Sequence, residues 1–207
     1  MADIVKVIGI FTKDSRSSST AQERGARLRE DIAHANEVWG NCQINFVFGD
    51  TYNYTDRTIN ASSVNSSDNN SAVDRLIEEV KARRNQETAI YVVYLSGDYF
   101  SDDHTIGVGG PLVFNKTSDT NYNEVGHIGL TNIAGSSDSP YSFAHEAGHV
   151  LFGRYVNNTF TINDPSTGKF HNDNSRNIMY SPVPETTPLV NASQCQIAKQ
   201  SRVILNN

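Results

Sequence analysis

Three apolar extended runs, separated by two amphipathic helical patterns, fill the first half of this 207-residue sequence. The runs lie at residues 4–11, 43–48 and 89–95, and the helical patterns lie at residues 20–39 and 73–84. Such an alternation predicts right-handed crossovers onto a parallel sheet covered by helices. The run at 89–95 is apolar throughout, which is typical of a central strand buried on both faces.

Two further extended segments follow at residues 105–114 and 124–132. The first contains Gly107, Gly109 and Pro111, residue types that sheets tolerate mainly in edge strands. We therefore expect residues 105–114 to form an edge of the sheet, and residues 124–132 to lead into the next helix.

Polar segments make up much of the remaining sequence. Residues 50–70 carry Asp, Asn, Ser and Thr with little apolar content, and we expect a long surface loop there. Residues 156–178 are similarly polar, and residues 182–188 contain three prolines. We therefore expect one domain, with an N-terminal subdomain at 1–153 and an irregular C-terminal subdomain at 154–207 that closes a cleft.

Residues 145–149 read His-Glu-Ala-Gly-His, which is an H-E-x-x-H pattern. Residues four apart share one face of a helix, so His145 and His149 can each direct a ring nitrogen at one point about 2 Å away, the usual zinc–nitrogen distance. Glu146 lies beside them, where a carboxylate can take a proton from a metal-bound water. The short pattern also arises by chance in a helix with two incidental histidines, so the rest of the chain must decide.

Local signals predict where two helices begin and end. Ser139 and Pro140 are suited to the N-cap and the first position of the helix that carries the H-E-x-x-H pattern. Gly153 is suited to a left-handed C-cap. A terminal helix is expected within residues 193–205, with Ser193 as its cap.

A catalytic zinc usually has three protein ligands and one position for water, so the second half of the chain must supply a third ligand. The candidates are His171, Asp164, Asp173 and Glu185. We prefer His171 because of the sequence after it. The pair Met179-Tyr180 begins eight residues later and is followed closely by a proline.

On these residues the sequence resembles the metzincin metallopeptidases, zinc enzymes with an elongated H-E-x-x-H-x-x-G-x-x-H site and a methionine-containing turn under the metal. The matching residues are His145, Glu146, His149, Gly153, His171 and Met179. The step from His171 to Met179 is most similar to the matrixin branch. The order of strands and helices also resembles the N-terminal subdomain of the family.

The sequence departs from the family pattern at two places. The family glycine follows the second histidine by three residues, where this chain has Phe152, and Gly153 comes one residue later. The third histidine of the family follows that glycine by three residues, whereas His171 lies 18 residues beyond Gly153. An insertion near residues 154–170 must therefore loop out and return, which is acceptable because loop closure becomes only slowly more costly with length.

The resemblance implies an α+β fold with an α/β-like N-terminal part. Its sheet is five-stranded, mostly parallel and twisted, with an antiparallel edge strand. An active-site helix follows, and then an irregular lobe with the methionine turn and a terminal helix. The resemblance also implies zinc bound by His145, His149 and His171, with Glu146 as general base. Met179 would support the site from below without coordinating the metal.

The implied function is a zinc-dependent endopeptidase that acts on a peptide or protein substrate. The substrate would lie extended against the edge strand at 105–114, where Gly107 and Gly109 leave room for it. Tyr180 would pack in the wall of the cleft or donate to the developing oxyanion, and packing is the preferred role.

Two alternatives stay open. A gluzincin-type hydrolase would use a glutamate as third ligand, and Glu185 is the candidate, although no helical pattern surrounds it. A non-proteolytic zinc-binding or toxin module would keep the fold without cutting peptides. The intact Glu146 argues against this module, because a binder needs no base there.

The composition and net charge of the chain limit the kinds of partner that we expect it to bind. The net charge of −6 and a pI near 5.4 argue against nucleic acid or anionic membranes. No apolar run approaches the roughly 18 residues of a membrane span. We expect a monomer. Cys42 and Cys195 form either one disulfide or two free thiols, and the sequence leaves both open.

Two further expectations concern calcium and location. Asp102-Asp103 and Asp68-Asn69 are candidate calcium ligands, although their spacing is not that of a calcium loop and solvated charge is the preferred interpretation. The first residues lack the basic and apolar regions of a signal peptide. We nevertheless expect a secreted or extracellular protein, from the reaction class and the polar surface rich in Asn and Ser.

Overall fold

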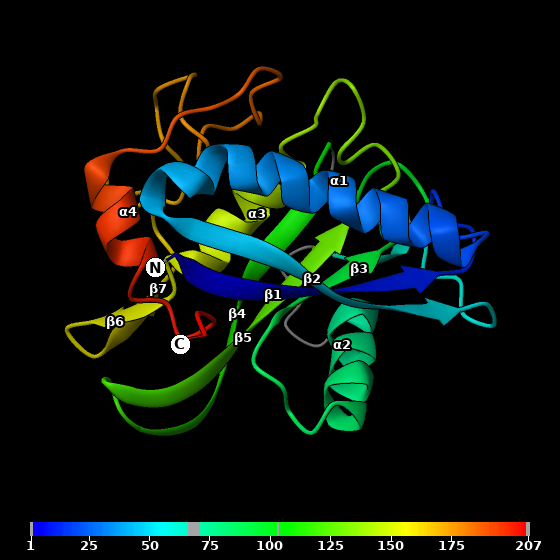
Figure 1. Cartoon of the computed structure of the whole chain (residues 1–207), viewed down its shortest axis with the longest axis horizontal. Coiled ribbons are helices and arrows are strands. Elements are labelled where there is room, and N and C mark those ends of the chain that lie inside the picture. Colours follow the sequence, from blue (N-terminus) through cyan, green and yellow to red (C-terminus); the bar gives the residue numbers. More distant parts are fainter. Residues whose placement is uncertain (1, 66–70, 103, 206–207) are drawn as a thin grey trace.

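The computed structural model describes residues 2–65, 71–102 and 104–205 (Figure 1). The main sheet consists of β1 (Asp3–Thr12), β2 (Ile44–Tyr54), β3 (Ile90–Tyr94), β4 (Gly107–Ser118) and β5 (Asn121–Leu130). The helices are α1 (Ala21–Trp39), α2 (Ala72–Arg83), α3 (Ser142–Leu151) and α4 (Ala192–Ala198), with short 3-10 turns at Gly40–Cys42 and Ala61–Ser63. A small hairpin pairs β6 (Arg154–Val156) with β7 (Thr159–Thr161).

The strands of the main sheet lie in the order β2-β1-β3-β5-β4. The first four are parallel, and β4 runs antiparallel to β5 at the edge, with Gly107 opposite Leu130. The predicted fold class is confirmed: a mixed α/β chain with a five-stranded, mostly parallel sheet and one antiparallel edge strand.

Helices cover both faces of the sheet, with α1 and α3 on one side and α2 on the other (Figure 1). The central strand β3 shows why: Ile90, Val92 and Tyr94 join the core under α1 and α3, while Tyr91 and Val93 join the core under α2. All five residues are buried, as expected for an apolar run in a parallel sheet.

The prediction of a surface loop over residues 50–70 was wrong for its first part. Strand β2 continues to Tyr54 and pairs with β1 along its whole length. Backbone pairing does not need apolar side chains at an exposed edge, so the polar residues of this strand concealed it. Ala61 and Val64 are buried in the core under α2. Residues 66–70 lie outside the described part of the chain.

The predicted ends of α3 were also wrong. The N-cap is Tyr141, which makes no side-chain cap. Ser139 instead closes the preceding turn, where its hydroxyl donates to the Ile133 carbonyl at 2.7 Å. The helix ends at Leu151, and its C-cap, Phe152, is not left-handed. Gly153 provides space rather than a special backbone angle: a Cβ there would lie 2.6 Å from Cγ of Pro111.

The lobe after α3, residues 154–205, is less regular than the sheet. Its terminal helix α4 is capped by Asn191 and Gln194, so the predicted cap at Ser193 is two residues too late, and the helix ends at Ala198. Several neighbouring polar residues are able to cap a helix here, and local sequence did not distinguish them. The division into two subdomains remains an interpretation.

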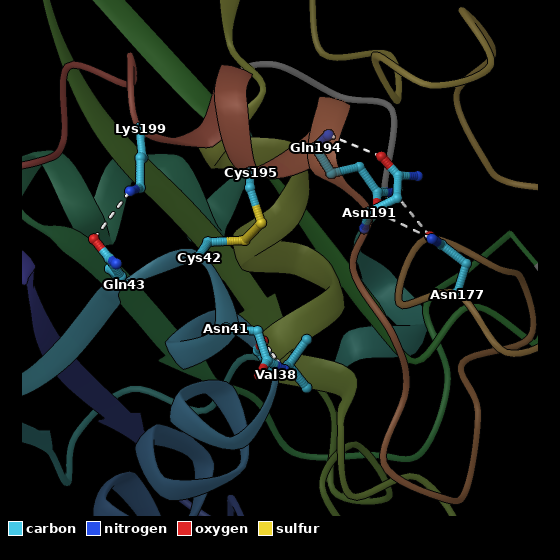
Figure 2. The surroundings of a disulfide bond; sticks show 9 residues. All are labelled: Val38, Asn41, Cys42, Gln43, Asn177, Asn191, Gln194, Cys195 and Lys199. Atoms are coloured by element: carbon cyan, nitrogen blue, oxygen red, sulfur yellow. Dashed lines mark hydrogen bonds between the residues drawn. A yellow bond between two sulfur atoms is a disulfide. The ribbon is translucent and has the colours of Figure 1, made fainter.

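A disulfide joins Cys42, in the 3-10 turn that follows α1, to Cys195 on α4, with Cα atoms 5.0 Å apart (Figure 2). This result settles the alternative that the sequence left open. Among the described residues, none of the helices is long and apolar enough to cross a bilayer.

Candidate metal centre

Helix α3 carries the H-E-x-x-H residues into the interior. It packs against α1 and β4, and all ten of its residues are buried. The indole nitrogen of Trp39 donates to the Ala144 carbonyl at 3.0 Å, which fixes the helix on α1. His145, Glu146 and His149 are only 3%, 7% and 1% exposed. The helix therefore holds two histidines and a carboxyl group in fixed positions.

The structure brings His171 to these two histidines. One ring nitrogen from each of His145, His149 and His171 lies within 4.8 Å of the others. Nδ1 of His145 lies 2.6 Å from the Ile178 carbonyl, so this nitrogen is engaged and Nε2 is left for the cluster. Among the residues that the structure describes, these three histidines are the group whose possible ligand atoms lie close enough together to hold one metal ion.

Burial sets the protonation of the cluster. It lowers the pKa of His145 to about 4, lowers that of His149 well below its usual range, and also lowers the pKa of His171. All three rings are therefore neutral near pH 7, the form that binds metals. Burial raises the pKa of the Glu146 carboxyl to about 8, and a cation held by the rings would favour its ionised form.

Asp164 holds the inserted segment, residues 154–170, next to the histidine cluster. This fully buried carboxylate accepts hydrogen bonds from the backbone and side chain of Ser166 at 2.8 and 2.7 Å. It also accepts from Asn172 at 2.6 Å and from Gln194 at 3.0 Å. Because Asn172 adjoins His171, the acid holds the insertion, the third histidine and α4 together.

Gln194 extends this network to the turn under the cluster (Figure 2). Its amide donates to Asn177 at 2.8 Å and accepts from the Asn177 amide at 3.0 Å. Asn177 in turn accepts from the backbone of Met179 at 2.9 Å. Met179 is fully buried against α3, where a Cβ on Gly148 would lie 2.5 Å from its sulfur. The glycine between the two histidines thus makes room for the methionine.

The other candidate ligands lie elsewhere. Asp164 has its oxygens occupied by the hydrogen bonds above, and Asp173 is exposed and pairs with Lys169 at 2.6 Å. Glu185 is exposed on the proline-containing loop. None of the three belongs to the cluster formed by the described residues. Asp68, Asn69 and Asp103 lie outside the described chain, so calcium binding remains a prediction.

The three predicted substrate residues have different surroundings. A Cβ on Gly107 or Gly109 would lie 2.8 or 2.7 Å from atoms of Glu146. The space that these glycines leave is therefore occupied by α3, and a substrate contact through their backbone remains a prediction. Tyr180 is half-buried, and the next residues, Ser181 and Pro182, line the cleft. Its predicted role is untested.

The histidines open into a cleft of about 1120 Å³ that runs along β4. Its lining includes Phe160 from β7, Ile162 just after β7, and Phe170, which directly precedes His171. The sequence interpretation missed these three residues, although a lone phenylalanine in a polar stretch beside a candidate ligand was a usable signal.

Comparison with known proteins supports the fold. No protein-family model and no curated protein matches the sequence. The crystal structure of metalloproteinase-II from Bacteroides fragilis is similar with a TM-score of 0.59 and 16% identity, over 96% of this chain and 53% of that chain. A structure described as a chaperone–substrate complex gives a TM-score of 0.49 with 14% identity, over 97% of this chain and 39% of that one, and carries no further weight. The chain thus shares the fold of a metalloproteinase and spans about half of its length.

Proposed function

We propose that this chain is a zinc-dependent endopeptidase. The observation that carries the proposal is the cluster of His145, His149 and His171, with ring nitrogens within 4.8 Å of one another and Glu146 beside them in a cleft. The chain also shares its fold with a metalloproteinase, at 16% identity.

The residues fit zinc rather than calcium or magnesium. Three neutral imidazoles are a frequent ligand set of catalytic zinc, whereas the harder cations prefer oxygen. The carbonyl of Ile178 orients the His145 ring as an outer partner of a metal ligand does. The His149 ring stacks on Phe170 and lies near the backbone of Ile162, although its Nδ1 makes no hydrogen bond of full geometry among the described residues. Met179, under α3, would support the site without coordinating.

When bound, zinc would lower the pKa of a coordinated water and polarise the scissile carbonyl. Glu146 would take the proton of the attacking water and pass it to the leaving amine. The carboxyl is buried, adjoins both His145 and the edge strand, and lines the cleft. The substrate would lie extended along the edge of β4, where backbone groups of Gly107 and Gly109 can pair with it. Tyr180 would pack in the side of the cleft.

Zinc content and cleavage test the proposal together. The purified chain should hold about one zinc, and His171→Ala should lose most of it, whereas His127→Ala and Glu185→Gln should keep it. His127 is a matched control because it lines the same cleft but pairs with Asp74 at 3.0 Å instead of joining the cluster.

Glu146→Ala should retain zinc and lose peptide cleavage by several orders of magnitude. Equal zinc in wild type and His171→Ala would reject the ligand set. Loss of zinc in Glu185→Gln would favour the gluzincin alternative. A zinc-loaded wild type that cleaves no peptide of a diverse library would favour the non-proteolytic module.

We further propose that the protein acts outside the cytosol, as a monomer. The Cys42–Cys195 disulfide supports an oxidising location, since glutathione keeps most cytosolic thiols reduced. Fractionation of the source cells and their medium would test the location, and finding the chain only in the cytosol with free thiols would reject it. Light scattering of the purified chain would give its oligomeric state.

A further inference from the structure

We propose that the insertion before His171 supplies a specificity wall, formed by Phe160, Ile162 and Phe170. This wall receives an apolar side chain, aromatic or large aliphatic, from the substrate residue beside the scissile bond. The inference rests on the proposed peptidase function and adds the class of residue that the site prefers.

Phe170 is the centre of the wall. Its ring stacks on the His149 ring, with centroids 4.1 Å apart and planes at 16°, and meets the His171 ring edge-on at 4.7 Å. Two of the three clustered histidines thus contact the phenylalanine ring. The residue is nevertheless 46% exposed and lines the cleft. A large apolar surface that is fixed in place and open to a cleft is the kind of surface that a ligand covers.

The hairpin β6–β7 and the residue after it, Ile162, add the other two side chains, and the hairpin is itself anchored. Phe160 meets Tyr155 at 5.0 Å, and Tyr155 meets Tyr122 of the main sheet at 5.3 Å. Ile162 lies against β4, since its Cδ1 is 3.9 Å from the position of a Cβ on Gly110. The wall therefore rests on the sheet through contacts that precede any substrate, and little conformational entropy is lost when a side chain packs on it.

The charges of the cleft favour an apolar occupant. In the part of the chain that the structure describes, the cleft lining contains no lysine or arginine, and its acids are Asp74 and Glu146. Asp74 is paired with His127, and Glu146 lies beside the histidine cluster. The nearest lysine in sequence, Lys169, pairs with Asp173 away from the cleft. Apart from the proposed zinc, an acidic side chain placed on Phe170 would therefore find no cationic lysine or arginine in this lining.

Cleavage-site mapping on a peptide library tests the wall. Wild type should cut with an aromatic or large aliphatic residue at one fixed position next to the bond. Phe170→Ala should lower kcat/KM about 10- to 100-fold for such a peptide and much less for the same peptide with alanine at that position. Phe48→Ala is the matched control, because Phe48 is an exposed phenylalanine (38%) that lies over Arg29 rather than in the cleft.

Two further measurements keep the test decisive. Zinc content is determined for every variant. Because Phe170 stacks on a proposed ligand, Phe160→Ala provides a second variant whose ring contact is with Tyr155. Binding of the same peptides to zinc-loaded Glu146→Ala gives a readout that does not depend on turnover, and adding Phe170→Ala should weaken only the binding of the apolar peptide.

The outcomes separate the two proposals. A wild type that cuts peptides, with an unchanged preference in Phe170→Ala and Phe160→Ala, overturns the wall and leaves the peptidase intact. If Phe170→Ala loses zinc, an unchanged preference in Phe160→Ala overturns the wall and a reduced preference supports it. A wild type that holds zinc but neither cuts nor binds peptides overturns the proposed function, and the wall with it.

Discussion

Two regions of the molecule are stabilised differently. Apolar packing stabilises the sheet and its helices, whereas polar contacts stabilise the C-terminal lobe. Strand β3 has all five residues buried, and α3 has all ten buried among apolar neighbours. The lobe, residues 154–205, has two three-residue strands and one seven-residue helix, tied by side-chain hydrogen bonds around Asp164 and Gln194 and by one disulfide. Two histidines of the cluster belong to the first region and the third belongs to the second.

The two regions should therefore tolerate substitutions near the candidate metal centre to different extents. Apolar cores tolerate volume-conserving substitutions, since their packing is not directional. Buried polar networks do not, because each lost partner leaves an unsatisfied group in a low-dielectric interior. The position of His171 should therefore be more sensitive to single substitutions than the positions of His145 and His149.

Asp164→Ala should have the largest effect. It removes a fully buried carboxylate that accepts from Ser166, Asn172 and Gln194, and hydrogen bonds to a charged group contribute about 1.5–3 kcal/mol each. Ser166 is exposed and can turn to water, whereas Gln194 is fully buried. We expect a loss of roughly 3 kcal/mol or more in the free energy of unfolding, together with weaker zinc binding. Denaturant titration of the zinc-free chain and chelator competition measure the two quantities.

Asp173→Ala is the control in the same lobe, because Asp173 forms only an exposed pair with Lys169. Such pairs contribute about 0–1 kcal/mol, so stability and zinc affinity should stay close to wild type. If Asp164→Ala binds zinc as tightly as the control, the hydrogen-bond network does not position the third histidine, and the contrast between the regions fails.

The double substitution Cys42→Ser and Cys195→Ser should come next. The bond links residues 153 positions apart, and native disulfides typically contribute about 2–4 kcal/mol. Because Cys195 adjoins Gln194 on α4, the loss should be concentrated in the lobe. Hydrogen exchange should show faster exchange around Asn172 and Met179 and little change in β3. Equal acceleration throughout the sheet would instead mean that the two regions unfold as one unit.

The same contrast explains which features were predictable from sequence. The apolar runs of β1 and β3, and the periodicity of α1, carry their burial pattern in local sequence, so the sheet was anticipated. The pattern at 145–149 likewise specified the helical part of the site. His171 was selected through its distance from Met179, which is a family resemblance rather than a local signal.

The lobe was less predictable because its partners are far apart in sequence. Asp164 is polar in a polar stretch, and nothing nearby shows that Asn172 and Gln194 will satisfy it, so it was considered as a ligand. The cap of α4 at Asn191 was missed for a similar reason, since Ser193 offers the same chemistry two residues later. The continuation of β2 to Tyr54 was hidden by polar side chains on an edge strand.

Glu124 tests the contact between the two regions through the pH dependence of stability. This buried acid of β5 accepts from Ser201 of the lobe at 3.2 Å, and its other oxygen is buried without a hydrogen-bond partner in the described chain. Burial raises its pKa from 4.5 to about 8. Between these values the folded chain keeps a proton that the unfolded chain releases, so stability should fall as pH rises through this window.

The expected slope is at most about 1.4 kcal/mol per pH unit between about pH 5 and 8, and Glu124→Gln should remove it. The stability difference between wild type and variant, measured by denaturant unfolding at several pH values, isolates this group, since Glu146 contributes to both proteins. A difference that grows in favour of the variant up to about pH 8 would place an ionisable contact between sheet and lobe. If the difference in free energy of unfolding does not change with pH, water reaches Glu124, and the contact between sheet and lobe is more open than the burial of this residue indicates.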